Sequence, residues 1–109
     1  MAVVYSSLFL LLPDNVSEQE ATVPDGYVFV IRDVSGVFNL GALFSVRVDI
    51  SPDGVSYYGV YEANNTAGAG GFHQEMRVVV PPGFIIRASS GGGAGSASCA
   101  VSGYSLTTP

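Results

Sequence analysis

Apolar residues in this chain alternate with polar ones or run in short blocks, and glycine and proline separate the blocks. The blocks are rich in Val, Ile, Tyr and Phe, which favour strands, and no stretch has the period of an amphipathic helix. About eight short strands with frequent turns are typical of an all-β fold, here a single antiparallel β-sandwich that is jelly-roll-like. The strands are predicted near 3–12, 27–34, 36–40, 43–50, 55–62, 72–80, 84–89 and 97–107.

The segment LFSVRVDI at 43–50 shows the alternation of a strand most clearly. Successive side chains point to opposite faces of a strand, so one set is predicted to face the core and the other to face out. The core set is Phe44, Val46, Val48 and Ile50, and the outward set is Ser45, Arg47 and Asp49. The turn residues SPDG follow at 51–54, so 43–62 is predicted to be a β-hairpin. The polar run DNVSEQE at 14–20 is predicted to be a loop or a single helical turn.

A similar phrase occurs twice, as VPDGYVFVIR at 23–32 and as VPPGFIIR at 80–87. In the first copy Pro24, Asp25 and Gly26 suit a type I turn that ends in a left-handed glycine, and the second copy suits a type II turn. Each copy predicts a proline–glycine turn that begins a buried strand and leads to an outward arginine. Two such turns half a domain apart are what a sandwich of two similar sheets requires.

The charge content changes the picture of the surface. Only 12% of the 109 residues are charged, 48% are hydrophobic, and the net charge is −5. So few charges predict that part of the surface is covered by other subunits. The basic side chains are four arginines with no lysine, so the composition argues against nucleic-acid binding driven by phosphate neutralisation.

The first residues, MAVVYSSLFLLLP, form an apolar run that is too short to cross a bilayer and lacks the basic region of a signal peptide. We therefore expect no membrane partner. Residues 1–12 are predicted to be an N-terminal strand or docking arm, and 13–109 the β-sandwich domain. An ordinary edge strand is an equal alternative to docking or strand exchange. The side chains predicted to dock are Val3, Val4, Tyr5, Leu8, Phe9, Leu10 and Leu11.

Few residues are candidates for chemistry. His73 and Glu75 share a strand face, as the start of a metal site requires, but the chain has no second histidine. DISPDG at 49–54 matches the first half of a calcium loop, yet Val60 stands where that loop needs Glu, and a hairpin turn explains the same residues. Cys99 is the single cysteine and is predicted to be a small buried hydrophobe, because no motif supports a Cys99–His73 nucleophile pair. We predict no enzyme activity, no catalytic residue, no metal and no cofactor.

Aromatic residues offer a candidate of another class. VSYYGVY at 55–61 clusters Tyr57, Tyr58 and Tyr61, and sugar-binding sandwiches stack sugar rings on exposed aromatics. Strand alternation predicts Tyr57 and Tyr61 on one face and Tyr58 on the other. The alternative is that one face is core and the other a subunit interface, which makes Tyr58 an interface candidate.

Two motifs resemble a group of small structural proteins of tailed bacteriophages and prophages. They are V-P-x-G followed by an aromatic and V-I-R-D-V at 23–34, and the ending V-S-G-Y-S-L-T-T-P at 101–109. That group typically has V-P-A-G-x-x-W-V-V-R-D-V early, a proline–glycine turn before a late strand, and S-G-Y-x-L-T-x-P at its C-terminus. This chain has Tyr27 and Phe29 where the group often has tryptophan, and FHQEMRVVV at 72–80 in place of an aromatic-rich W-x-G-R-Q-V-L stretch.

The resemblance implies a virion structural protein of β-sandwich fold with no catalytic residues to carry over. We expect a capsid decoration protein that binds the lattice of the major capsid protein as a homotrimer and stabilises the shell through many modest contacts. We expect it in the virion, assembled in the host bacterial cytoplasm. A tail or head–tail connector protein is one alternative, and a small carbohydrate-binding module for host adhesion is another.

Overall fold

A computed structural model of the chain describes residues 3–12, 18–38, 44–65, 70–92 and 97–107. All regular secondary structure in this part of the chain is β-strand. None of the described residues forms a helix long and apolar enough to cross a membrane. The strands are β1 (Val3–Leu12), β2 (Glu18–Thr22), β3 (Tyr27–Phe38), β4 (Phe44–Ser51), β5 (Tyr58–Asn65), β6 (Gly70–Val80), β7 (Ile85–Gly92) and β8 (Ala97–Thr107).

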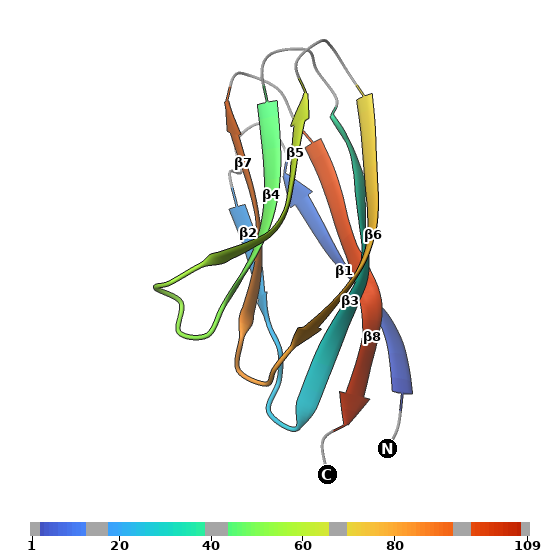
Figure 1. The fold of residues 1–109 in the computed structure, drawn as a ribbon, viewed down its shortest axis with the longest axis vertical. Coiled ribbons are helices and arrows are strands. Elements are labelled where there is room, and N and C mark those ends of the chain that lie inside the picture. Colours follow the sequence, from blue (N-terminus) through green and yellow to red (C-terminus); the bar gives the residue numbers. More distant parts are fainter. Residues whose placement is uncertain (1–2, 13–17, 39–43, 66–69, 93–96, 108–109) are drawn as a thin grey trace.

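The strands form two four-stranded sheets that pack face to face (Figure 1). Sheet A has the order β1-β8-β3-β6, and sheet B has the order β2-β7-β4-β5. All neighbouring strands run antiparallel. Strands β4 and β5 form the predicted hairpin, whereas every other pair of consecutive strands divides between the two sheets. This arrangement confirms the predicted all-β, jelly-roll-like antiparallel sandwich.

β3 is one strand where the sequence predicted two, at 27–34 and 36–40. Gly36 lies within the continuous strand. The position requires glycine because a Cβ there would overlap the carbonyl oxygen of Ser98 in β8. Glycine here permits a close approach of two backbones and does not mark a break. β3 is irregular elsewhere: its register with both β6 and β8 shifts between Ile31 and Asp33. Residues 39–40 lie outside the described residues.

β2 replaces part of the loop or helical turn predicted at 14–20, so that prediction is wrong for residues 18–20. The strand is the outer strand of sheet B, and its only partner there is β7. Its exposed side chains, Glu18, Glu20 and Thr22, are polar and alternate with the half-buried Gln19 and Ala21. A half-solvated edge strand of this kind lacks the apolar run that identifies a strand in the sequence. Residues 13–17 lie outside the described part.

The core lies between the sheets and is built mainly from aliphatic side chains. Val46 and Val48 are fully buried and Ile50 packs against them, as predicted, while the side chain of Phe44 lies outside the described part. Burial of each large aliphatic side chain contributes roughly 1.5–3 kcal/mol to stability. The buried cluster comprises Val23, Phe29, Ile31, Val34, Phe38, Val46, Val48, Ala63, Val80, Ile86, Ala88, Cys99 and Val101.

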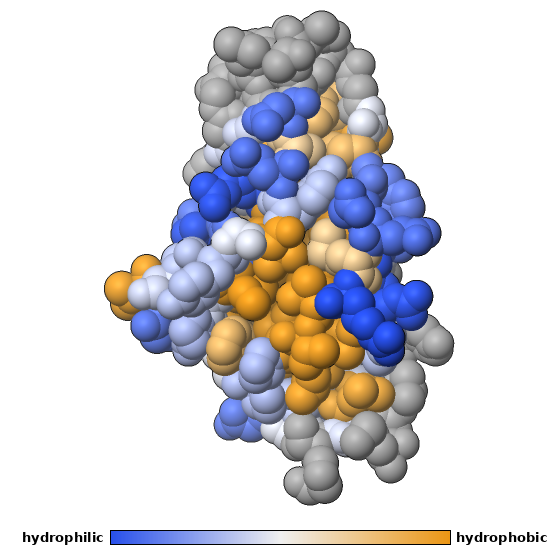
Figure 2. All heavy atoms as spheres, viewed as in Figure 1, coloured by the Kyte–Doolittle hydropathy of each residue, from blue (hydrophilic) through white to orange (hydrophobic). Residues whose placement is uncertain are grey.

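Partly buried apolar side chains extend the core towards the side of the sandwich where β5 and β6 are the edge strands. Among them are Val60 on β5 and Met76 and Val78 on β6. Figure 2 shows apolar atoms gathered between these two strands, with hydrophilic atoms over β6 beside them. The core is therefore less completely covered on this side of the molecule.

The two proline–glycine turns lie side by side at one end of the sandwich, where β2 passes to β3 and β6 passes to β7 (Figure 1). The Val23 N–H donates to the Phe84 carbonyl oxygen at 2.9 Å, and the Gly83 N–H donates to the Val23 carbonyl oxygen at 2.9 Å. Gly26 and Gly83 have φ of 85° and 81°, the left-handed conformation that glycine adopts without strain. The repeated phrase thus builds two crossings between the sheets that hydrogen-bond to each other.

β1 is the outer strand of sheet A and pairs along its whole length with β8, from Val3 opposite Leu106 to Leu12 opposite Ala97. The backbone thus takes the strand alternative of the N-terminal prediction. Side chains of residues 1–17 lie outside the described part. The docking role of the apolar side chains of residues 3–11 therefore stays a prediction.

Candidate functional site

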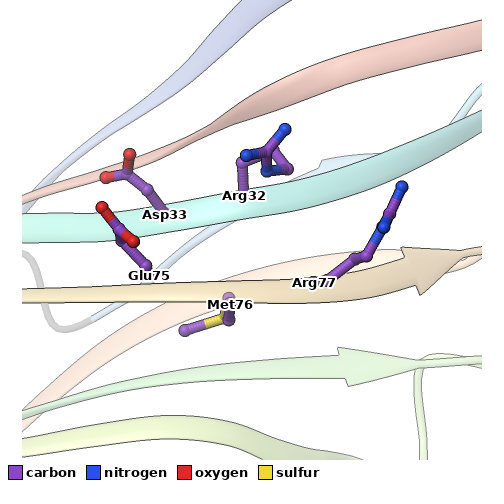
Figure 3. A pocket seen from close by; sticks show the side chains of 5 residues that line it. All are labelled: Arg32, Asp33, Glu75, Met76 and Arg77. Carbon is purple, nitrogen blue, oxygen red and sulfur yellow. The ribbon is translucent and has the colours of Figure 1, made fainter.

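A concavity of about 430 Å³ lies on the outer face of sheet A, next to the irregularity in β3. Figure 3 shows that its charged side chains point away from sheet B, with the Asp33 and Glu75 carboxylates near each other and the two arginines further along the strands. Asp33 and Glu75 are direct cross-strand neighbours. The lining residues are Arg32, Asp33, Glu75, Met76 and Arg77.

His73 lies beside this concavity, and 3.2 Å separates its Nε2 from Asp33 Oδ1. The described residues contain no group of three or more His, Cys, Asp or Glu side chains placed to hold a metal ion. Cys99 is buried in the core, on the other face of the sheet. It lies opposite Gly36 of β3, and Gly36 in turn lies opposite Phe72 of β6. His73 follows Phe72 and so points outward. The two residues therefore do not form a nucleophile–base pair.

Burial raises the pKa of the Cys99 thiol to about 11 from an ordinary value of 9.0. The thiol therefore loses its proton at a lower pH in the unfolded chain than in the folded one. The stability that the buried, neutral thiol contributes is fully present below pH 9 and is lost as the pH rises through about 11. We expect the free energy of unfolding to fall on the order of 2 kcal/mol further over this range in the wild type than in Cys99→Ala. Urea unfolding at pH 8 to 11 measures this, and the variant controls for the tyrosines. Parallel curves would contradict the prediction.

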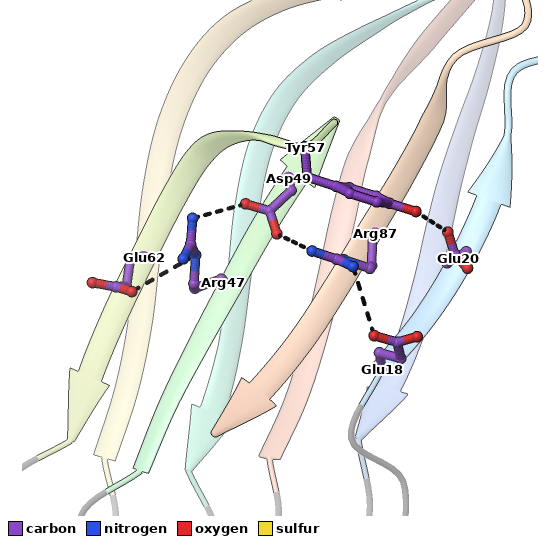
Figure 4. A network of polar contacts seen from close by, with 7 residues as sticks. All are labelled: Glu18, Glu20, Arg47, Asp49, Tyr57, Glu62 and Arg87. Carbon is purple, nitrogen blue, oxygen red and sulfur yellow. Dashed lines mark hydrogen bonds and ion pairs between the residues drawn. The ribbon is translucent and has the colours of Figure 1, made fainter. Parts of the chain in front are cut away.

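Asp49 is the most buried charged residue of the described part, with 1% of its surface exposed. The sequence predicted it to face outward, away from the core. Its carboxylate does lie on the outer face of sheet B, but two arginines enclose it (Figure 4). Arg47 Nη2 donates to Oδ1 at 3.2 Å, and Arg87 Nη2 donates to Oδ2 at 3.2 Å.

The two arginines extend this network across all four strands of sheet B (Figure 4). Arg87 Nη1 lies 3.7 Å from a Glu18 carboxylate oxygen on β2, and Arg47 Nε lies 3.8 Å from a Glu62 carboxylate oxygen on β5. The charges thus link β2, β7, β4 and β5 from one edge of the sheet to the other. Their role is to hold the strands together, since each arginine is already paired with carboxylates.

Tyr57 covers this network from the hairpin loop. Its ring centroid lies 3.6 Å from the guanidinium carbon of Arg87, a cation–π contact. Its hydroxyl donates to a Glu20 carboxylate oxygen at 2.9 Å. That hydrogen bond raises the pKa of Tyr57, because ionisation would remove the donated proton beside a carboxylate.

The loop between β4 and β5 is closed by its own side chains. Ser51 Oγ accepts from the Gly54 N–H at 2.8 Å, and Asp53 Oδ1 accepts from the Val55 and Ser56 N–H groups at 2.8 and 2.9 Å. These bonds, first those from Ser56 and Val55, lower the pKa of Asp53. The residues that match the start of a calcium loop thus form the predicted hairpin turn, and both oxygens of Asp49 bond arginines.

The three tyrosines of 55–61 do not share a surface. The pairing of β4 with β5 shifts where Val48 lies opposite Tyr61 and Asp49 lies opposite Gly59, so one extra residue lies between. This bulge changes the alternation. Tyr61 packs against the core while Tyr57 lies on the outer face, so the prediction that they share one face is wrong. Tyr58, at 59% exposure, is open to solvent and stays an interface candidate.

Apolar side chains other than those predicted are also exposed. Val55, at 82% exposure, lies in the β4–β5 loop, which projects from the sandwich in Figure 1. Val79, at 58%, lies on β6 on the solvent side of the run Val78–Val80. Neither was predicted to be exposed. Val55 was placed in the strand predicted at 55–62, whereas β5 begins at Tyr58, and the apolar run Val78–Val80 conceals the alternation that exposes Val79. Val37 on β3 is similarly open.

No protein-family model and no curated protein sequence matches the chain. Solved structures resemble it in fold. The Drosophila NLP core, whose structure was described in relation to pentamer formation and histone binding, is 11% identical with a TM-score of 0.53, over 95% of this chain and 99% of that one. Eiger TNF from S. frugiperda is 5% identical with a TM-score of 0.54, over 91% and 92%.

A pentameric capsid protein from metagenomic phage sequences is 14% identical with a TM-score of 0.46, over 96% of this chain and 62% of that one. Identities this low say nothing about a shared activity. What the first two structures show is the fold: the chain is a jelly-roll-like β-sandwich.

Proposed function

We propose that this chain is a structural subunit of a phage particle that acts by packing against copies of itself and against the shell. The observation that carries the proposal is the set of apolar side chains left open on the described surface. Val55, Tyr58 and Val79 are each more than half exposed, in a chain with only 12% charged residues. Exposed apolar side chains favour contact with other protein surfaces.

The two motifs that resemble tailed-phage proteins support a shared architecture. Ile31 of the V-I-R-D-V motif lies opposite Gly103 of the S-G-Y motif, at the irregularity of β3. A backbone contact between the two central strands of sheet A explains why a group with this fold would use both motifs. The resemblance thus rests on a fold-determining contact and not on a reactive site.

Within the particle we assign the chain to capsid decoration, as a homotrimer bound to the major capsid protein. The charged network links all four strands of sheet B, which suits a subunit that reinforces a lattice. Many modest contacts on a repeating surface give strong overall binding. A tail or head–tail connector subunit with the same fold would be present at a far lower copy number.

The carbohydrate-binding alternative receives less support. A sugar platform needs exposed rings side by side, whereas Tyr57 stacks on Arg87 and Tyr61 packs against the core. Tyr58 alone of the three is more than half exposed.

The test is the number of copies in purified particles of the phage or prophage that encodes the chain. Quantitative mass spectrometry against the major capsid protein is expected to find copies on the order of hundreds per particle. A handful of copies would favour the tail or connector alternative. Absence of the chain from purified particles would contradict the structural proposal.

A further inference from the structure

β6 is an edge strand that nothing covers in the described structure. It is 11 residues long, from Gly70 to Val80, and pairs with β3 on one side only. The other side of such a strand presents N–H and C=O groups that can pair with another strand. In Figure 1 the upper half of β6 lies at the right margin of the molecule and the lower half bends towards the centre, and in Figure 2 hydrophilic atoms lie over the upper half.

The register of β6 with β3 shifts between Val78 and Glu75, but the burial of the β6 side chains alternates regularly through this region. Met76 and Val78 pack against the core, while Glu75, Arg77 and Val79 are exposed. Glu75 and Arg77 therefore present opposite charges on the same outer face, with Met76 between them (Figure 3). Proteins commonly protect an edge strand with charges, and two charges of one sign would repel a second copy of the strand. Two opposite charges in this spacing do the reverse.

Both charges lie beside charges of their own sign within sheet A. Glu75 is the direct cross-strand neighbour of Asp33. Arg77 lines the same concavity as Arg32 (Figure 3). Among the ion pairs of the described residues, none includes the side chain of Glu75 or Arg77. Like charges at such positions destabilise a sheet, so both residues gain from an opposite charge on the open side of β6.

We propose that β6 pairs antiparallel with β6 of a second copy of this chain, about a twofold axis at Met76. In this register Glu75 lies opposite the partner's Arg77, and Arg77 lies opposite the partner's Glu75. The two copies of sheet A become one continuous sheet, in the order β1-β8-β3-β6-β6-β3-β8-β1. Backbone hydrogen bonds supply affinity, and the two charge pairs select the register.

The pairing also covers apolar surface. Val79, now 58% exposed, comes to lie opposite the partner's His73. The inference rests on the proposed self-association and specifies one of its contacts. A twofold contact links two copies whether they are free chains or members of neighbouring trimers.

Charge reversal tests the pairing. In analytical ultracentrifugation Glu75→Arg alone or Arg77→Glu alone is expected to raise the dissociation constant of the twofold contact about tenfold or more, because each places like charges opposite each other. The double variant exchanges the two signs and should return the constant to within about threefold of wild type. Asp25→Arg makes the same charge change as Glu75→Arg in an exposed turn and should leave the constant unchanged. Far-UV circular dichroism checks that each variant folds.

Cysteine cross-linking tests the register independently. Met76→Cys places a thiol opposite its own copy, at a cross-strand distance that a disulfide can span, so it should yield a covalent dimer on mild oxidation. Val79→Cys faces the partner's His73 and should not. Cys99 is buried and does not compete. Covalent dimers from both variants, or from neither, would overturn the register.

The outcomes separate this pairing from self-association in general. The β6 pairing is overturned if neither single charge reversal alters the dissociation constant, or if the double variant fails to restore it. Self-association would then take place through another surface. A wild-type chain that stays monomeric at its highest soluble concentration overturns both.

Discussion

Gly103→Ala is expected to lower the free energy of unfolding by about 3 kcal/mol, at the upper end of what overpacking costs. Gly103 lies in β8 opposite Ile31, where β3 shifts register. A Cβ at this position would overlap the carbonyl oxygen of Val30 and approach the Arg32 backbone nitrogen to 3.1 Å. These are backbone atoms of a central strand, so they cannot move aside without breaking the pairing of β3 with β8.

Urea unfolding followed by far-UV circular dichroism measures the loss, and Gly71→Ala is the matched control. A Cβ at Gly71 would meet its nearest neighbour, the Gly36 carbonyl oxygen, at 3.5 Å, which is ordinary contact. Alanine there should leave stability unchanged or raise it by up to about 1 kcal/mol, because glycine is unfavourable within a strand. Equal stability of the two variants would show that β3 and β8 are not in such close contact at Gly103.

Asp49→Ala is expected to lower the free energy of unfolding by about 3 kcal/mol, since it removes the buried carboxylate and leaves the two arginines only their longer ion pairs with exposed Glu18 and Glu62. The loss of a partner is most costly for Arg87. Its side chain is only 23% exposed, and its Nε already has no hydrogen-bond partner within the described structure. The lost carboxylate also removes the link between β4 and β7 on this face. Thermal and urea unfolding both measure the effect.

Two variants check that the loss comes from the enclosed charge. Glu62→Ala removes a carboxylate from the same network at a position where both partners are 51% exposed, and should cost less than about 1 kcal/mol. Asp49→Ala combined with Arg87→Ala should cost less than the sum of the single changes, because the residues contact each other. Additive losses would contradict the proposed coupling.

The fold class and most strands could be predicted because alternation and turn residues are local signals. The contacts between strands that are distant in the sequence were harder to predict. β2 escaped detection because its outer face is polar, and the two predicted halves of β3 are joined through Gly36, whose role depends on Ser98 far along the chain. The outward direction of Asp49 was predicted correctly, but its burial depends on distant segments. Its strand position faces outward, but Arg87 and Tyr57 arrive from other segments to cover it.

The candidate interface shows the same limit. Glu75, Met76 and Arg77 are visible in the sequence, yet their spacing acquires meaning only once β6 is known to lie at the edge of a sheet. In a central strand the same three residues would face two neighbours and offer nothing to a second copy. Tyr58 was predicted from alternation and is exposed, whereas Tyr57 and Tyr61 were separated by a bulge that local patterns do not reveal.

The pairing of β1 with β8 has a consequence for how the protein is made. Of the eight strands, the first to be synthesised finds its hydrogen-bonding partner in the last, from Val3 opposite Leu106 onward. Until β8 emerges from the ribosome, the apolar segment VVYSSLFLLL lacks the strand with which it pairs, so the nascent chain is open to aggregation or to chaperone binding while the six strands between them are made. Refolding should be slow for so small a chain, on the order of milliseconds to seconds, because closure of the sheet joins distant parts of the sequence.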